Sequence, residues 1–169
     1  GRPINNVIPL STNESISTFV VLNTIDDNGY LFMSTKMGMI NKIPVTLFKK
    51  IRSTGLKAIV LKPGDELLGA HYTSPKQQLM LIADNGKAIR FSEQDVRERF
   101  RGTLGVKGMQ LTSDSSLVSI LKPNNGEIIT VTENGYGNRV SVNNYNLQKR
   151  GGVGVISVSY THLTLPTNS

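Results

Sequence analysis

Short apolar runs separated by tight-turn residues dominate the pattern of this chain. The run at 79–82 (Leu-Met-Leu-Ile) is followed by an Asn-Gly pair at 85–86, and the chain returns through an apolar stretch at 88–91. An Asn-Gly pair between two apolar stretches is the strongest short-range signal for a β-hairpin. The run at 128–132 and the Asn-Gly pair at 134–135 repeat this arrangement. The pattern therefore predicts β-hairpins joined by short turns.

The hairpin recurs along the chain. The turn glycines Gly38, Gly86 and Gly135 are separated by 48 and 49 residues. Self-similarity at a fixed period is typical of repeat architectures, and a period of about fifty residues suits one four-stranded antiparallel blade. The sequence therefore predicts an all-β, propeller-like protein with about three blades. We place the repeats at about 1–54, 55–104 and 105–157.

Basic residues recur at one phase of this repeat. Lys42, Arg90 and Arg139 each lie four residues after a turn glycine, and an apolar residue follows each of them. Because successive side chains alternate between the faces of a strand, we expect these three cations to point outward. A second set in step with the first is Arg52, Arg101 and Arg150. Cations in register suggest a surface that follows a long, regular, negatively charged partner.

Composition narrows the class of partner and of chemistry. The 169 residues carry a formal net charge of +7 at pH 7, with a pI of about 9.8. This balance favours an anionic partner, with nucleic acid ahead of a membrane surface. The absence of cysteine excludes disulfides, thiolate metal sites and cysteine nucleophiles, and it fits a reducing cytoplasm. The sequence has no apolar run long enough to cross a bilayer.

The two ends of the chain differ from the repeats. The sequence begins Gly-Arg-Pro without an initiator methionine, so we expect a fragment of a longer protein. Residues 158–169 contain no Asp, Glu, Lys or Arg and break the repeat where a further blade would start. They resemble a translated sequencing adapter, and we exclude them from fold reasoning as a non-native tail. The expected domain therefore covers residues 1–157.

Four segments follow one known family pattern, in order and in one register. They are 1–10 (Gly-Arg-Pro-Ile-Asn-Asn-Val-Ile-Pro-Leu), 90–97 (Arg-Phe-Ser-Glu-Gln-Asp-Val-Arg), 105–109 (Gly-Val-Lys-Gly-Met) and 130–139 (Thr-Val-Thr-Glu-Asn-Gly-Tyr-Gly-Asn-Arg). In these segments the chain resembles the C-terminal domains of bacterial DNA gyrase A proteins. The resemblance implies a β-pinwheel, a propeller-like disc that binds duplex DNA around its rim and bends it.

The resemblance also implies a parent enzyme. That parent would be a cytoplasmic type IIA topoisomerase in which gyrase A and gyrase B proteins form an A2B2 complex and ATP drives negative supercoiling. ATP and Mg²⁺ would act on other parts of that complex, and the catalytic tyrosine would lie outside this chain. We therefore expect no catalytic residue, no metal site and no cofactor in this fragment.

One difference from the family pattern leaves two possible parent enzymes. The family's box, Gln-Arg-Arg-Gly-Gly-Lys-Gly, is present here only in degenerate form at 148–154, as Gln-Lys-Arg-Gly-Gly-Val-Gly. We expect the full box in an earlier blade. Because the full box is absent here, a second parent stays possible. This alternative is topoisomerase IV, whose protein corresponding to gyrase A has a related C-terminal domain.

A DNA-wrapping rim needs cations for phosphate contact and glycines where backbone N–H groups approach closely. We expect one cation cluster in each blade. The predicted DNA-binding residues are Lys42, Lys49, Lys50, Arg52, Lys57, Arg90, Arg101, Lys107, Arg139, Lys149 and Arg150. The glycines predicted to bring backbone N–H groups to phosphate are Gly55, Gly105, Gly151 and Gly152.

The same cations and glycines also have structural interpretations that need no DNA. A lysine on a strand often guards a sheet edge, and the glycines can serve turns and blade packing instead of phosphate. A basic, propeller-like scaffold for protein interaction is a second hypothesis for function. A propeller glycosidase is a third, and it would need paired carboxylates at one site.

Overall fold

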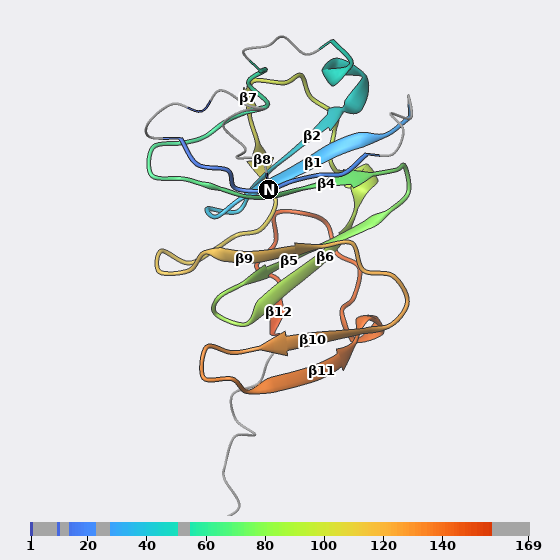
Figure 1. Ribbon diagram of the computed structural model, residues 1–169. Helices are drawn as coiled ribbons and strands as arrows, with labels where there is room; N and C mark the ends of the chain where they lie inside the picture. Colours follow the sequence, from blue (N-terminus) through green and yellow to red (C-terminus); the bar gives the residue numbers. More distant parts are fainter. Residues whose placement is uncertain (2–9, 11–13, 23–27, 51–54, 157–169) are drawn as a thin grey trace, which may run out of the picture.

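The computed structural model describes residues 1, 10, 14–22, 28–50 and 55–156 (Figure 1). The three hairpins are formed by β1 (Tyr30–Thr35), β2 (Met39–Pro44), β5 (Gln78–Ala83), β6 (Lys87–Ser92), β10 (Glu127–Val131) and β11 (Gly137–Ser141). The other strands are β3 (Ile59–Val60), β4 (Leu67–Thr73), β7 (Thr103–Leu104), β8 (Val106–Lys107), β9 (Leu117–Leu121) and β12 (Val155–Ile156).

The three predicted hairpin turns are confirmed. Gly38, Gly86 and Gly135 have φ angles of 82°, 76° and 82°, in the left-handed region that favours glycine. The first two turns join the central strands of four-stranded sheets, β1–β2 and β5–β6, and the third joins the two-stranded hairpin β10–β11. The local Asn-Gly and Met-Gly signals thus fix where each hairpin reverses.

Two complete blades stack one above the other in Figure 1. Their four-stranded sheets have the orders β4-β1-β2-β8 and β9-β5-β6-β12, and all of these pairings are antiparallel. The hairpin β10–β11 lies beyond the second blade. This arrangement confirms the all-β fold with four-stranded antiparallel blades.

Each complete blade takes its last strand from a later part of the chain. Val106 of β8 lies opposite Ile40 of β2, and Val155 of β12 lies opposite Ala88 of β6. The first blade therefore draws on all three predicted repeats, 1–54, 55–104 and 105–157. A sequence repeat and a structural blade have the same period but are not the same stretch of chain.

The continuous apolar run of β5 is explained by burial on both faces. Leu79 and Leu81 belong to a core that includes Phe32 of the first blade, whereas Met80 and Ile82 pack with Ile128 of the third hairpin. A strand buried on both faces carries apolar residues without alternation. β10 instead alternates, because Ile128 is buried and its neighbour Ile129 is exposed.

A short 3-10 helix follows the hairpin of each blade: η2 (Val45–Phe48), η3 (Glu93–Asp95) and η4 (Val142–Asn144). The Ser92 hydroxyl accepts a hydrogen bond from the Gln94 N–H at 3.2 Å, and Ser141 caps η4 in the same way. The segment 93–100 is thus a single helical turn followed by irregular chain.

Within the described residues, no helix has both the length and the apolar character that a membrane span requires.

Candidate nucleic-acid interface

The prediction that Lys42 points outward is wrong. Its side chain is buried, with 7% of the residue exposed, and its Nζ lies 2.8 Å from Oε1 of the buried Glu93. The same ammonium lies 4.3 Å from the centre of the Tyr30 ring. Glu93 belongs to η3 of the second blade, so Lys42 of β2 joins two blades. A buried, paired cation of this kind is poorly placed to contact DNA.

Arg90, the next residue at this phase, is also turned toward a neighbouring blade. Its Nη1 donates to the carbonyl oxygens of Val142 at 2.9 Å and Tyr145 at 3.1 Å, and its Nε donates to Gln78 at 2.7 Å. The backbone contacts of Lys42 and Arg90 are also equivalent. The Lys42 carbonyl accepts a hydrogen bond from the Arg99 N–H, and the Arg90 carbonyl accepts one from the Gln148 N–H. The phased cations 42 and 90 therefore brace each blade against the 3-10 turn that follows the next hairpin.

Arg139, the third member of this set, is exposed. Its Nε lies 3.3 Å from Oε2 of Glu127, which is the diagonal neighbour on β10, because Ile129 is the residue directly opposite Arg139. This exposed ion pair has little energetic weight, because water screens both charges. The predicted outward orientation thus holds for Arg139 and fails for Lys42.

Exposed cations gather instead where neighbouring blades meet at their edges. At the first junction the Gly102 N–H donates to the Ala58 carbonyl at 2.8 Å, and β3 pairs with β7 in parallel. This pairing brings the exposed side chains of Lys57 and Arg101 to the same junction. One cation comes from each of the two segments.

The second junction repeats the first. The Gly151 N–H donates to the Gly108 carbonyl at 2.6 Å, which places Lys107 beside Arg150. The Arg150 guanidinium is partly occupied, because its Nε donates to the Asp95 carbonyl at 3.1 Å and its Nη1 to the Lys107 carbonyl at 2.9 Å. Lys107 and Lys149 are exposed. We name Lys57 with Arg101, and Lys107 with Lys149 and Arg150, the two junction clusters.

Most of the predicted phosphate-binding glycines serve packing. An added Cβ at Gly105 would lie 2.6 Å from the Ile40 carbonyl oxygen, so this glycine lets β8 approach β2 closely. The Gly151 N–H is already bonded to Gly108, and the Gly152 carbonyl accepts from Gln110. Gly55 differs, because it is exposed, has a φ of 75° and has open space where a side chain would be. The Gly151 N–H is therefore already used within the protein, whereas phosphate approach stays a prediction for Gly55, Gly105 and Gly152.

The remaining predicted cations lie after the first hairpin. Lys49 and Lys50 are exposed and follow η2 directly. Arg52 lies outside the described residues.

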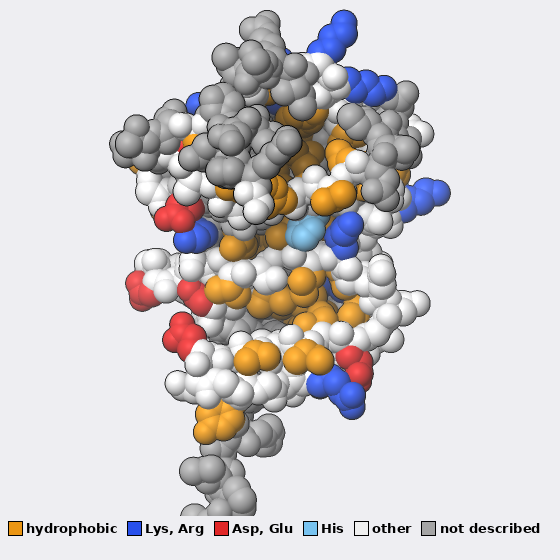
Figure 2. Space-filling model, viewed as in Figure 1, with side chains coloured by type: hydrophobic (Ala, Val, Ile, Leu, Met, Phe, Trp, Pro, Cys, Tyr) orange, Lys and Arg blue, Asp and Glu red, His pale blue; other side chains and the backbone are white. Residues whose placement is uncertain are grey.

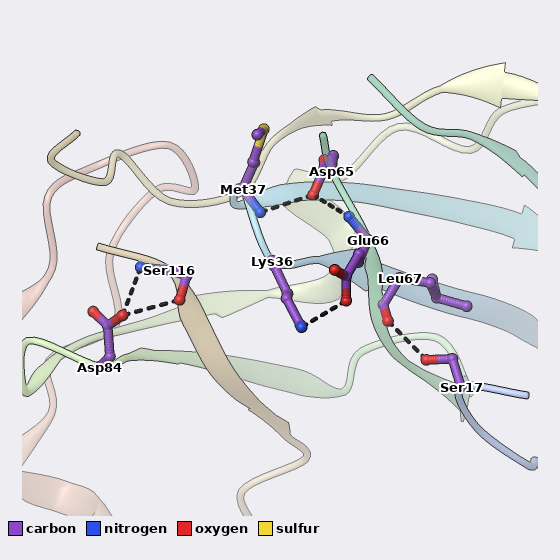
Figure 3. Close-up of polar contacts among 8 residues, drawn as sticks. All are labelled: Ser17, Lys36, Met37, Asp65, Glu66, Leu67, Asp84 and Ser116. Carbon is purple, nitrogen blue, oxygen red and sulfur yellow. Dashed lines mark hydrogen bonds and ion pairs between the residues drawn. The ribbon is translucent and has the colours of Figure 1, made fainter. Parts of the chain in front are cut away.

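Five acidic residues lie at the hairpin ends of the blades, whereas the exposed Asp95 lies beside the second junction cluster, where its carbonyl accepts from Arg150. Figure 2 shows them along one side of the molecule, and Figure 3 shows their contacts. Asp84 accepts from the backbone N–H and hydroxyl of Ser116, both at 2.9 Å, while Glu66 pairs with Lys36 at 2.6 Å. Slight burial raises the pKa of Asp84, but the hydrogen bonds from Ser116 outweigh it and leave this pKa below its usual value. The acidic residues of this hairpin edge are Asp65, Glu66, Asp84, Asp114 and Glu133.

Within the part of the chain that the structure describes, no group of three or more His, Cys, Asp or Glu side chains could hold a metal ion.

Known proteins share both the sequence and the architecture of this chain. The family model for the DNA gyrase C-terminal domain, described as a β-propeller, matches residues 29–74, 77–124 and 126–166. The chain belongs to this family. The DNA gyrase A protein of Salmonella typhimurium is 40% identical over 162 residues, and that of Escherichia coli is 38% identical over the same length. Each alignment covers 95% of this chain but only 18% of the relative.

Two solved structures share the fold. A DNA gyrase A C-terminal domain has a TM-score of 0.83 and 31% identity over 91% of this chain and 52% of its own. The C-terminal domain of a DNA topoisomerase IV has a TM-score of 0.84 and 29% identity over 92% of this chain and 49% of its own. The β-pinwheel predicted from the sequence is thus confirmed.

The degenerate box of this gyrase C-terminal domain lies against the second blade. The Gln148 N–H donates to the Arg90 carbonyl at 2.8 Å, and an added Cβ at Gly154 would lie 2.6 Å from the Ala88 carbonyl oxygen. The box glycines thus let the segment fit the edge of β6, while Lys149 stays exposed. The sequence reveals the cations of this segment but gives no sign that its glycines are held by the neighbouring blade.

Proposed function

We propose that this gyrase C-terminal domain binds duplex DNA along its blade junctions and bends it. The observation that carries the proposal is the recurrence of one arrangement at two successive junctions. In each, a lysine of one segment (Lys57 or Lys107) lies beside a basic turn of a later one (Arg101 or Lys149-Arg150). A partner with a regular array of negative charges matches such repetition.

The energetics favour a partner that contacts several junctions. Bending a short duplex through a large angle costs on the order of 1–6 kcal/mol. Each lysine or arginine that neutralises a phosphate releases condensed counterions, so several contacts offset this cost where one would not. Lys57, Arg101, Lys107 and Lys149 are exposed and available for such contacts.

Charge segregation supports a defined path. The five acidic residues of the hairpin edge outnumber the cations there (Lys36, Lys62 and Lys87), so this edge attracts a polyanion less than the junction clusters do. Because exposed charges act over about 10 Å at 0.1 M salt, this contrast guides DNA only at close range. DNA would therefore follow the junctions and avoid the hairpin ends.

The parent enzyme belongs to the proposal as well. We expect a bacterial gyrase in the cytoplasm, with gyrase A and gyrase B proteins in an A2B2 complex and ATP-driven negative supercoiling. In this proposal ATP and Mg²⁺ act on other parts of that complex, as the family resemblance implies. The relatives matched over 95% of the chain favour gyrase, and the similarity to a topoisomerase IV domain makes that enzyme the alternative parent.

Binding of the 169-residue chain to a linear duplex across a salt series tests the proposal. Fluorescence transfer between the two duplex ends reports bending. We expect binding that weakens steeply with salt and shortens the end-to-end distance. If the folded chain does not bind DNA at any salt concentration, the proposal is contradicted and the protein-scaffold hypothesis is favoured. Binding without shortening would remove the bending part only.

A further inference from the structure

Phe100 is an apolar side chain in an unexpected position. It lies between Arg99 and Arg101 at the first junction, and 76% of the residue is exposed. Among the aromatic residues that the structure describes, it is the most exposed. Phe32 and Phe91, by contrast, are fully buried and lie 6.3 Å apart in the core between the first two blades.

The backbone around Phe100 is held on both sides. The Arg99 N–H donates to the Lys42 carbonyl at 2.8 Å, and the Gly102 N–H donates to the Ala58 carbonyl at 2.8 Å. The Phe100 carbonyl itself accepts from the Thr103 hydroxyl at 2.8 Å. The ring therefore projects from a turn that is fixed to the preceding blade. A turn held in this way loses less conformational entropy when a partner binds.

The fold does not require an apolar residue at this place. The residue one repeat later, Lys149, is charged and exposed, although the backbone there makes the equivalent contact from Gly151 to Gly108. One repeat earlier the sequence places Ile51 between Lys50 and Arg52, outside the described residues. Because the same turn accommodates the charged Lys149 one repeat later, its backbone contacts do not require an apolar side chain at position 100.

An apolar side chain flanked by cations suits one feature of DNA. Proteins that bend duplexes often insert Phe, Leu, Ile or Met between two base pairs from the minor groove, which unstacks the step and kinks the helix. The flanking cations hold the phosphates on either side. At this junction the exposed Arg101 follows Phe100 in the chain, and the exposed Lys57 lies on the segment that leads into the paired strand β3.

We infer that Phe100 is a wedge that enters a base-pair step of the bound duplex and localises the bend at the first junction. This inference rests on the proposed function, because it needs DNA along the junctions. Phosphate contacts supply the affinity, and the ring sets where the duplex kinks. The second junction, with Lys149 in place of the ring, contacts DNA by charge alone.

The test compares the wild-type chain with Phe100→Ala, and with Tyr136→Ala as the control. Tyr136 is another exposed aromatic residue, on the β10–β11 hairpin away from the junctions, with 51% of its surface open. Each protein is titrated with a duplex labelled at both ends that carries 2-aminopurine at its central step. A second duplex has a central mismatch, which lowers the cost of unstacking.

The wedge predicts four results for the wild type and the control. Binding of either protein should shorten the end-to-end distance of the duplex and raise the 2-aminopurine fluorescence. Both proteins should bind the mismatched duplex about tenfold more tightly than the matched one, and both should show the same slope of log K against log salt. Phe100→Ala should keep the salt slope and lose the fluorescence rise, most of the shortening and the mismatch preference. Phe100→Leu, which keeps an apolar wedge, should retain part of all three.

Two outcomes separate the inference from the proposed function. If the wild type does not bind duplex DNA at all, both fail. If the wild type binds with a steep salt slope but Phe100→Ala bends and unstacks DNA equally well, the wedge is wrong and the proposed function stands.

Discussion

The charge of Lys42 is held inside the protein by Glu93, a residue from the next blade. Burying two charges is costly, and only the close pairing of the two side chains makes this burial tolerable. The nearby Tyr30 is affected as well, because partial burial and the Glu98 carboxylate raise the pKa of its hydroxyl. At the residue scale, the first phased cation is thus part of the protein's own packing.

Replacing Lys42 by Met should destabilise the protein by about 3–5 kcal/mol, because Glu93 would be left buried without a partner. The double variant Lys42→Met with Glu93→Gln should recover most of this loss, since no charge then remains buried. Urea unfolding of the three proteins measures both effects. Equal stability of the single variant and the wild type would mean that the pair is not buried.

His71 should make stability depend on pH. Burial, with a smaller effect from Lys122, lowers its pKa below 6.5, although its Nε2 contact with the Ile120 carbonyl at 3.1 Å acts in the opposite direction. As pH falls below 6.5, the unfolded chain takes up a proton before the folded chain does, so stability decreases. Because His71 is only half-buried, we expect a loss of at most about 1 kcal/mol.

Unfolding at about pH 7.5 and about pH 5.5, on either side of the ordinary histidine pKa, measures this effect, with His71→Gln as the comparison. The stability of the wild type should fall more than that of the variant. Equal losses in the two proteins would assign the pH dependence to other groups.

At the element scale, the last strand of each blade locks neighbouring repeats together. β8 and β12 are only two residues long, yet each completes a four-stranded sheet formed earlier in the chain. The glycine that precedes each of these strands, Gly105 or Gly154, permits the close approach to the carbonyl of Ile40 or Ala88. The blades therefore form an interlocked unit, and the way they are joined determines where the junction clusters lie.

Gly105→Ala tests this locking. The added methyl group would lie 2.6 Å from the Ile40 carbonyl oxygen, so β8 must shift, and we expect a loss of about 1–3 kcal/mol. Gly55→Ala is a useful comparison, because no atom lies within 4 Å there and the cost comes from its φ of 75° alone. A Gly105→Ala protein with unchanged stability and weakened DNA binding would instead support the original phosphate-approach prediction.

Local signals explain which elements can be predicted from the sequence. The turns at Gly86 and Gly135 are predictable because an Asn-Gly pair and its flanking apolar residues form one contiguous signal. The pairing of β8 with β2 and of β12 with β6 cannot be predicted in this way, because a two-residue strand has no periodicity and its partner lies in another repeat. The burial of Lys42 escapes prediction for a similar reason, since Glu93 lies far from it in the sequence. The apolar residues on both faces of β5 are a signal that neighbouring blades cover both sides.

At the scale of the whole molecule, two blades and a further hairpin present basic junctions and an acidic hairpin edge. The net charge of +7 alone would attract DNA anywhere on the surface. Binding at the junction clusters is a narrower expectation, because it ties affinity to particular cations. Removing charge at the junctions should therefore matter more than removing the same charge elsewhere.

The most direct test is the salt dependence of duplex binding for charge-matched variants. One removes the junction cations Arg101 and Lys107 (both to Gln), and the other removes Lys36 and Lys62 (both to Gln) near the hairpin edge. We expect the junction variant to reduce the slope of log K against log salt by about 1.8, because each phosphate contact contributes about 0.9. The hairpin-edge variant should keep the wild-type slope. Equal slopes for the two variants would contradict the junction assignment and leave only binding by net charge.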